Sequence, residues 1–362
     1  MAKIGIITYH FAGNYGAVLQ CYALNEYLNT CGHDAKVINC ITPKQGDNNS
    51  IYRENSNLKS IFKNILLLPF HKSRKLRFQR FNHFRNNNLK LTQLVQSVDE
   101  LKDLIEVEKF DYIVSGSDQV FNPNIYDFEP TFLYPFKTQS KKIGYAVSIG
   151  KATSEQLYKY AEWIKDFSSI SVREESAKER LSSYFKDITT VIDPVFLLNK
   201  TQWESICTKN KKRYLLGYYI NTKYRDQYIK ITKQVAKQLN IDLIIIDARI
   251  SKTIFKNKVI TSAGPKEFVE MFMNADFICT DSFHGTSFSI LLEKPFICFE
   301  PQKKSLDTRK TNLCKVAGLD RHIYYLDSSK DIYYGQINYD DVKRRIASII
   351  EISKEYLYSV LE

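Results

Sequence analysis

Short apolar runs alternate with longer stretches of helical periodicity along most of the chain. A short apolar run between polar residues is typical of a buried strand, and apolar residues three and four positions apart are typical of a packed helix. The N-terminal KIGIITY, AVLQCYALNEYLN and DAKVINC form a strand, helix and strand, which predicts a parallel sheet with right-handed crossovers. Strands are expected at 3–9, 34–40, 110–116, 141–150, 169–172, 189–193, 213–220, 242–247, 258–261, 276–280 and 295–299.

A polar and basic stretch at 199–212 interrupts this alternation and marks a domain boundary. The strand–helix pattern then starts again, which predicts an α/β fold of two Rossmann-like, doubly wound domains that face each other across a cleft. The expected domains are 1–205 and 206–335, followed by an amphipathic C-terminal helix at 336–362. Because such sheets bind ligands beyond the carboxyl ends of their strands, polar residues directly after strands are the candidates for a site.

The composition of the 362 residues narrows the class of protein. The seven cysteines show no CxxC or Cys/His spacing and most lie in apolar runs, so we expect no metal site and a reducing compartment. The chain opens as a strand without a signal-peptide pattern, and its apolar run at 65–70 is too short to span a bilayer. We therefore expect a cytoplasmic protein.

The formal net charge is +12, and residues 55–98 contain nine Lys or Arg and no acid. Such an excess indicates an anionic partner, either a phosphorylated substrate, a nucleic acid or an anionic membrane face. The basic stretch 72–90 is expected to be a helix that carries phenylalanines on one side and arginines on the other. These residues are Phe78, Phe81, Phe84, Arg74, Arg77, Arg80 and Arg85.

Two interpretations of this basic helix stay open. It either docks by its phenylalanines and leaves a solvated basic back, or it contacts an anionic bilayer or a lipid diphosphate carrier. No known nucleic-acid-binding module is present, so we expect no nucleic-acid partner.

Two polar loops follow strands in the first half of the chain. In HFAGNYG, Gly13 and Gly16 precede a helix, so the loop either lets the backbone approach an anion or is a tight βα turn. In SGSDQVFNP, small polar groups crowd the end of a very apolar strand, which favours a ligand contact, although Asp118 could instead cap a helix. The polar residues of this second loop are Ser117, Asp118, Gln119 and Asn122.

Arg173 ends a strand in SVREESA, where a guanidinium is less expected than the acids that follow it. It could grip a carboxylate or phosphate bidentately. The alternative is a structural salt bridge to Glu174 or Asp193.

The most specific stretch is ADFICTDSFHG, in which His284 stands at the turn from a strand into a helix. A histidine at a helix N-terminus, where anions bind, can give or take a proton near neutral pH. The alternative is that His284 only caps the helix or bonds Asp281. Cations follow the next strand, either as part of the site or as a solvated loop. They are Lys303, Lys304, Arg309 and Lys310.

Several of these motifs occur together and in one order: IGIITYHFAGNYGAVLQCYAL, DYIVSGSDQVFNP, SVREESA, IDPVFLL and ADFICTDSFHGTSFSILLEKPF. In this the chain resembles the polysaccharide pyruvyl transferase family, which is similar to two-domain GT-B glycosyltransferases. The resemblance implies transfer of a pyruvyl group from phosphoenolpyruvate to a hexose of a surface polysaccharide or its lipid-linked precursor. The product would be a cyclic ketal with release of phosphate, and phosphoenolpyruvate would be a co-substrate in an enzyme without a cofactor.

The resemblance also assigns roles to residues. By resemblance, His284 would be the general acid and could contact the donor. By their position alone, Asp118 and Asp281 are candidates for binding or activating the acceptor hydroxyls. Ser282 stands where the family often has Arg, which gives Arg309 more interest as a donor ligand. The donor candidates are Arg173, Ser282, His284, Lys303, Lys304 and Arg309, and the acceptor candidates are Asn14, Tyr15, Gly16, Ser117, Gln119 and Asn122.

The acceptor side is then expected in 1–205 and the donor side in 206–335. A polyprenyl-diphosphate-linked acceptor would bring the protein to the inner face of the cell membrane as a peripheral partner of anionic lipid. Two other classes compete: a glycosyltransferase that uses a nucleotide-sugar donor on the same architecture, and a non-catalytic binding protein.

Overall fold

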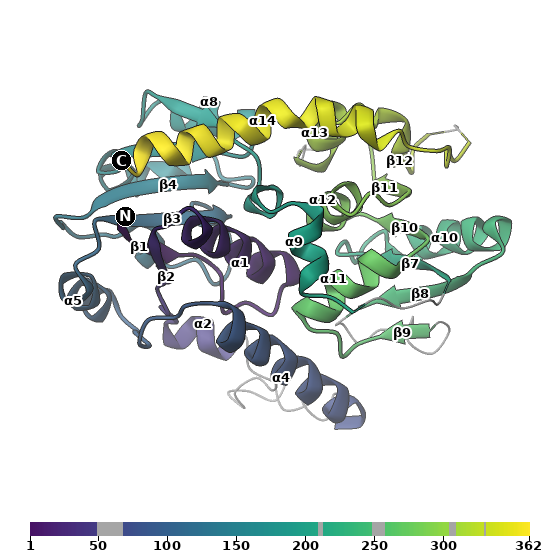
Figure 1. Cartoon of the computed structure of the whole chain (residues 1–362), viewed down its shortest axis with the longest axis horizontal. Helices are drawn as coiled ribbons and strands as arrows, with labels where there is room; N and C mark the ends of the chain where they lie inside the picture. The colour runs from purple at the N-terminus through teal and green to yellow at the C-terminus, as the bar shows by residue number, and fades with distance from the viewer. Residues whose placement is uncertain (49–67, 209–212, 248–257, 304–308, 329–330) are drawn as a thin grey trace. The chain divides into compact units, whose positions relative to one another are not determined.

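The structure is a computed structural model that describes residues 1–48, 68–208, 213–247, 258–303, 309–328 and 331–362. Its residues divide into two compact units. Two long helices, α4 (His71–Asn88) and α14 (Tyr339–Val360), contribute residues to both of them (Figure 1). Unit 1 contains Met1–Ile61, Asn82–Leu198 and Ser348–Glu362, and unit 2 contains Phe62–Phe81 and Asn199–Ala347.

Unit 1 is built on six parallel strands in the order β2-β1-β3-β4-β5-β6. This is the strand order of flavodoxin-like sheets, in which the order reverses between β1 and β3. The strands are β1 (Lys3–Ile7), β2 (Asp34–Val37), β3 (Tyr112–Asp118), β4 (Lys141–Val147), β5 (Ser169–Val172) and β6 (Ile188–Thr190). The helices are α1 (Tyr15–Thr30), α2 (Pro43–Asn48), α5 (Val98–Glu108), α6 (Ser154–Tyr158), α7 (Ala161–Lys165) and α8 (Glu175–Leu181).

Each face of the unit 1 sheet carries its own hydrophobic core, because successive side chains of a strand point to opposite faces. Tyr112 and Val114 of β3 pack in the core that includes Leu24 of α1. Ile113, between them, packs in the second core with Leu101 of α5. The near-continuous apolar runs in the sequence follow from this burial on both faces.

The last part of α14 completes the first of these cores. Tyr356 is buried there and donates from its hydroxyl to the Gly144 carbonyl oxygen at 3.1 Å. The Ser353 hydroxyl accepts a hydrogen bond from the Ile192 backbone N–H at 2.8 Å. Residues from the end of the sequence are therefore structural parts of the unit that begins with the first strand.

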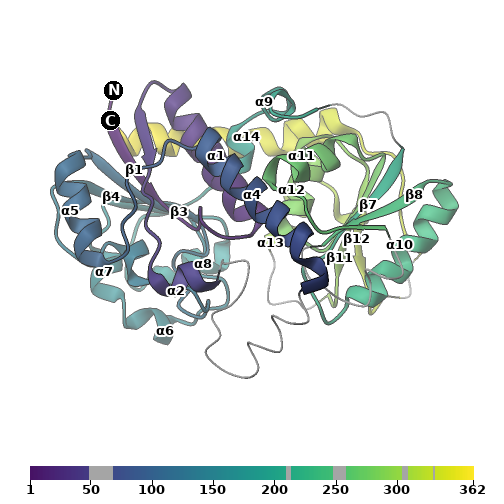
Figure 2. The same ribbon diagram turned by 90° about the horizontal axis from the view of Figure 1, so that it is seen from below.

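Unit 2 is also built on six parallel strands, in the order β12-β11-β10-β7-β8-β9 (Figures 1 and 2). This is the strand order of the dinucleotide-binding Rossmann fold, which reverses between β7 and β10. The strands are β7 (Tyr214–Tyr218), β8 (Asp242–Ile246), β9 (Lys258–Ile260), β10 (Phe277–Thr280), β11 (Phe296–Glu300) and β12 (Ile323–Tyr325). The helices are α9 (Lys200–Ser205), α10 (Arg225–Leu239), α11 (Pro265–Asn274), α12 (Phe283–Leu291) and α13 (Arg309–Val316).

Aromatic side chains fill both faces of the unit 2 sheet. Tyr228 of α10 stacks on Phe299 of β11, with ring centroids 4.9 Å apart. In a separate group of rings, Trp203 of α9 lies edge-on to Phe288 of α12 at 4.9 Å, and Phe268 of α11 is 5.8 Å from Phe288. Two helix-covered parallel sheets confirm the predicted α/β fold of two Rossmann-like units.

The helix expected at 72–90 is α4, and its phenylalanine side is packed. Phe81 and Phe84 are buried, and the Arg77 guanidinium lies over the Phe81 ring at 4.3 Å from its centroid. Arg80 forms an ion pair with Glu267 at 3.0 Å within unit 2. Arg77 and Arg80 of the basic side therefore make contacts within the protein. None of the helices in the described ranges is long and apolar enough to span a membrane.

His10, directly beyond β1, is a buried titratable group. Its ring nitrogens lie 3.1 Å from the Thr8 carbonyl oxygen and 3.0 Å from the Asn39 side-chain oxygen. Burial lowers the pKa of His10 from 6.5 to about 4, since desolvation of the imidazolium outweighs these two hydrogen bonds.

We expect this histidine to make stability depend on pH. Well above pH 6.5, His10 is neutral in both the folded and the unfolded chain, so its burial does not reduce the free energy of unfolding. As the pH falls from 6.5 towards 4, His10 of the unfolded chain binds a proton that the folded chain does not bind. The free energy of unfolding therefore decreases over this range. In His10→Gln the change in the free energy of unfolding between pH 7 and pH 4.5 should be smaller by about 2.4 kcal/mol. Urea unfolding at both pH values measures it. His83→Gln, at an exposed position of α4, is the control, and an unchanged dependence in His10→Gln would contradict the assignment.

Candidate functional site

The first candidate place is the start of α12, where the strand order of unit 2 reverses. Ser282 caps the helix: its hydroxyl accepts from the Gly285 N–H at 3.3 Å, and its own N–H donates to Thr280 Oγ1 at 3.1 Å. A Cβ on Gly285 would lie 2.3 Å from Thr280 Oγ1, so only glycine lets the first helical turn approach the strand this closely. These contacts fix half-buried His284 in the first turn, beyond the carboxyl end of β10.

Asp281 joins the two strands at which the order reverses. Its side chain is buried, and its two oxygens accept hydrogen bonds from the backbone N–H groups of Ile220 at 2.7 Å and Asn221 at 2.9 Å. Ile220 and Asn221 belong to the loop after β7. The Asp281 carboxylate therefore holds the loop that borders the site, and a role of Asp281 toward the acceptor stays a prediction.

A buried cation lies behind this helix start. The Lys310 ammonium donates to the Asp281 carbonyl oxygen at 2.8 Å and pairs with Glu300 at 3.2 Å, with side-chain exposures of 12% for Lys310 and 2% for Glu300. Burial alone would lower the pKa of Lys310, but Cys298, Glu300 and Asp281 together raise it above its ordinary value. Lys310 thus remains a fixed positive charge.

Arg309 brings a second cation to the same place. Its guanidinium lies over the Phe283 ring, 5.9 Å from the centroid, and the Phe283 ring is edge-on to His284 at 5.2 Å. Arg309 is therefore near Ser282, the position at which the resemblance leads one to expect an arginine. The partial positive charge of the helix N-terminus and the Arg309 guanidinium favour an anion at this point, whereas the charge of Lys310 is balanced by Glu300.

The remaining predicted cations lie elsewhere. Lys303 follows β11, is exposed, and lines a cavity to which neither His284 nor Arg309 contributes. Lys304 lies outside the described residues.

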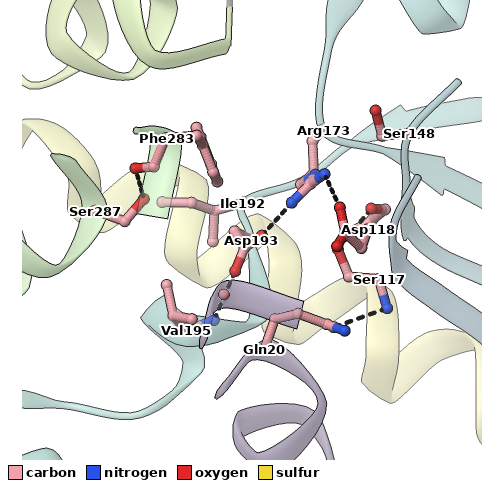
Figure 3. Close-up of polar contacts among 12 residues, drawn as sticks. Gln20, Ser117, Asp118, Ser148, Arg173, Ile192, Asp193, Val195, Phe283 and Ser287 are labelled. Carbon is pink, nitrogen blue, oxygen red and sulfur yellow. Dashed lines mark hydrogen bonds and ion pairs between the residues drawn. The ribbon is translucent and has the colours of Figure 1, made fainter. Parts of the chain in front are cut away.

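The second candidate place is in unit 1, where the strand order reverses between β1 and β3. Thr8 Oγ1 donates to the Ser117 carbonyl oxygen at 2.7 Å, and the Gln20 amide donates to Thr8 Oγ1 at 2.9 Å. The Ser117 N–H donates to Gln20 Oε1 at 3.1 Å (Figure 3). The Ser117 hydroxyl donates to the Ala146 carbonyl oxygen at 2.8 Å. Ser117 is therefore buried scaffold that positions its neighbour Asp118.

Asp118 ends β3 with a positive φ of 79° and forms an ion pair with Arg173 rather than a helix cap. The Arg173 side chain is 2% exposed, binds Asp118 Oδ1 at 3.3 Å and hydrogen-bonds Asp193 (Figure 3). It also lies 3.9 Å from Glu174. Asp193 also accepts from the Val195 N–H at 3.1 Å. The structural salt bridge weighed for Arg173 is thus present, and its role as a donor ligand stays a prediction.

The other predicted acceptor residues bond mainly to their own loops. Asn14 caps α1, where its side-chain oxygen accepts from the Gly16 N–H at 2.9 Å, and both Tyr15 and Gly16 are buried. The Gln119 side-chain oxygen accepts from the Asn122 amide at 2.7 Å. This geometry fits a tight βα turn and a self-bonded loop, and acceptor binding by these residues stays a prediction.

Sequence reasoning missed two polar residues beside these loops, Tyr9 and Asp127. The Tyr9 hydroxyl is buried and has no hydrogen-bond partner among the described residues. Burial raises the pKa of Tyr9, and the nearby Asp127, Asp118 and Glu129 raise it further. Burial also raises the pKa of Asp127. No sequence signal marks them, since Tyr9 extends the apolar run of β1 and Asp127 lies in an unpatterned loop.

No cluster of His, Cys, Asp and Glu able to hold a metal ion occurs within the described part of the chain.

Solved structures with a similar fold include UDP-GlcNAc 2-epimerases and an α-glucosyltransferase. The UDP-GlcNAc 2-epimerase from Methanocaldococcus jannaschii has a TM-score of 0.51 and 14% identity over 96% of this chain and 92% of that chain. The UDP-GlcNAc 2-epimerase from Neisseria meningitidis, bound to UDP-GlcNAc, has a TM-score of 0.51 and 12% identity over 98% and 93%. An α-glucosyltransferase in complex with UDP and DNA has a TM-score of 0.50 and 10% identity over 98% and 90%. At such identities the likeness shows a GT-B-type fold alone.

The sequence comparison is more specific. No curated protein matches the chain. A model of the family described as polysaccharide pyruvyl transferase matches residues 14–303, a range that includes Asp118, Arg173, Asp281 and His284. The chain belongs to the polysaccharide pyruvyl transferase family and is a transferase.

Proposed function

We propose that this transferase takes its pyruvyl group from phosphoenolpyruvate and that His284 is the proton donor of the reaction. The observation that carries the proposal is the position of His284, in the first turn of α12 beyond β10, with Arg309 and Lys310 close to the same helix start. Phosphoenolpyruvate carries a carboxylate and a phosphate, so its site needs fixed cations and N–H donors.

The reaction can be written around His284 as the acid. The imidazolium gives its proton to the methylene carbon of phosphoenolpyruvate, which becomes a methyl group and leaves C2 electrophilic. One acceptor hydroxyl forms a bond to C2 and loses its proton, and the C2–O bond to phosphate breaks. A second hydroxyl of the same hexose then bonds to C2 and loses its proton, which closes the ketal. Arg309 and the N-terminus of α12 would stabilise the negative charge of the leaving phosphate.

The acceptor hexose is assigned to unit 1, where Asp118, Tyr9 and Asp127 lie near the carboxyl ends of β1 and β3. A carboxyl group with a raised pKa is suited to take a proton from a hydroxyl near neutral pH, and burial has this effect on Asp127. Because the Asp118 carboxylate forms an ion pair with Arg173, Asp127 is the stronger candidate for the base.

A lipid-linked acceptor at an anionic membrane face belongs to the same proposal. Its support is the first half of α4, where Lys72, Lys75 and Leu76 are exposed. Exposed cations beside an apolar side chain suit contact with anionic lipid headgroups.

One assay tests the donor and the acceptor class. The full-length protein is incubated with phosphoenolpyruvate and candidate lipid-linked sugars, and the expected product is a sugar heavier by one pyruvyl ketal together with released phosphate. Phosphoenolpyruvate should also raise the melting temperature, whereas uridine diphosphate should not. Stabilisation by uridine diphosphate without phosphate release would instead support a nucleotide-sugar donor.

A further inference from the structure

Unit 2 contains a cavity, about 300 Å³ in volume, at the edge of its sheet beside β12. This size is at the lower end of the roughly 300–1,000 Å³ of small-molecule sites. The cavity does not include His284, Arg309 or Lys310, so it is separate from the proposed donor site. Its lining residues are Ile297, Lys303, Asp320, Arg321, His322, Ile323, Tyr324, Tyr325, Ser328, Asp331 and Tyr333.

The charges around this cavity are balanced. Lys303 and Arg321 supply two cations, and Asp320 and Asp331 supply two carboxylates. Among the described residues, no ion pair joins any two of these four side chains. A small anion in this cavity would be attracted by the two cations and repelled by the two carboxylates. A polyhydroxylated ligand suits it better, because each hydroxyl can donate to a carboxylate and accept from a cation.

Aromatic rings form much of the remaining wall. Tyr324, Tyr325 and Tyr333 line the cavity, and Tyr333 lies edge-on to His322 with ring centroids 5.1 Å apart. The electron-rich face of an aromatic ring attracts the slightly positive C–H groups of a sugar face. Rings combined with short polar side chains therefore match a ligand that has one apolar face and a polar rim.

His322 adds a hydrogen-bond acceptor whose state the structure fixes. Its Nδ1 lies 3.1 Å from the Phe296 carbonyl oxygen, which can only accept, so Nδ1 carries the hydrogen and Nε2 of the neutral ring can accept. Burial lowers the pKa of His322, which keeps the ring neutral. A neutral acceptor suits a hydroxyl group better than it suits an anion.

We propose that this cavity is a saccharide subsite, which holds a neutral sugar residue of the acceptor other than the hexose that receives the pyruvyl group. The proposal rests on the proposed function for the identity of the acceptor. It assigns Lys303 to acceptor binding rather than to the donor. It also gives the enzyme a contact with its glycan that is independent of the chemistry at His284.

Ligand-observed saturation-transfer NMR on the full-length protein tests the subsite. The sugar probes are methyl β-glucopyranoside and cellobiose, and the anion probes are inorganic phosphate and uridine diphosphate, offered as competitors. We expect saturation transfer to the sugars, no competition by either anion, and at least about tenfold weaker sugar binding in Arg321→Ala/Asp331→Ala. The matched control is Asp341→Ala/Arg345→Ala, which removes an exposed ion pair of α14 outside the cavity and should bind the sugars normally.

Each other outcome overturns the subsite. No transfer to either sugar, transfer that survives Arg321→Ala/Asp331→Ala, or displacement of the sugars by phosphate or uridine diphosphate would each do so. Stabilisation by phosphoenolpyruvate, measured on the same double variant, separates this proposal from the proposed function. This stabilisation should be the same in the double variant as in the wild-type protein. If phosphoenolpyruvate does not stabilise the wild-type protein, that result counts against the proposed donor and not against the subsite.

Discussion

Replacing His284 with glutamine is expected to slow phosphate release from phosphoenolpyruvate by about 10²–10⁴-fold, the usual contribution of a general acid. Glutamine keeps a polar group in the first turn of α12 but cannot deliver a proton to carbon. Because Ser282 and Gly285, rather than the imidazole, make the capping hydrogen bond, the melting temperature should stay close to that of the wild-type protein. Phosphate release in the presence of acceptor, measured together with thermal unfolding, checks both expectations.

His83→Gln is the matched control, since it removes an exposed histidine from the surface of α4. It should keep wild-type phosphate release. Full activity in His284→Gln would remove His284 from the mechanism. A large fall in melting temperature would show instead that the ring is needed for packing.

Replacing Arg173 with methionine is expected to destabilise unit 1 by about 3–5 kcal/mol, the cost of leaving buried carboxylates without their cation. Arg173 binds Asp118 and Asp193, and the Asp193 side chain is fully buried. For a unit of this size the loss corresponds to a fall in melting temperature on the order of 10 °C. Denaturant unfolding followed by circular dichroism measures it, and Arg173→Met/Asp193→Asn should recover part of the loss.

Lys178→Met provides the comparison within unit 1. Lys178 pairs with Glu175 at 3.8 Å on an exposed surface, where such pairs contribute less than about 1 kcal/mol. If Arg173→Met keeps its stability but is no longer stabilised by phosphoenolpyruvate, Arg173 acts as a donor ligand, and the structural role assigned to it here is wrong.

The fold could be predicted because its strands are buried on both faces and therefore stand out as apolar runs. Eleven of the twelve strands of the structure were expected from such runs. The exception, β12, has three residues and lies at the edge of its sheet, so its sequence carries too little pattern. The membership of 348–362 in unit 1 was not predictable either, because helical periodicity reveals an apolar stripe and not the surface that it covers.

The positions of the candidate site residues along the chain could be predicted, but the contacts of their side chains could not. The carboxyl ends of parallel strands mark where polar residues can gather, which pointed to Asp118, Asp281 and His284. Which of these are scaffold depends on partners far along the chain, such as the Asp281 contact with Ile220 and the Asp118 contact with Arg173. Such pairings have no signal in a single sequence.

The two ends of the chain meet in the core of unit 1, and this has a consequence for how the protein is made. Synthesis delivers β1 before the strands of unit 2, but Ser353 and Tyr356 leave the ribosome only after those strands. Until then Ile192 and Gly144 lack these partners, and the apolar surface that Tyr356 covers stays open to water. Domains usually fold in the order in which they emerge. Here the strands of unit 1 are synthesised before those of unit 2, but residues 348–362 of unit 1 are synthesised after them. The strands of unit 2 can therefore form their sheet before the core of unit 1 is complete.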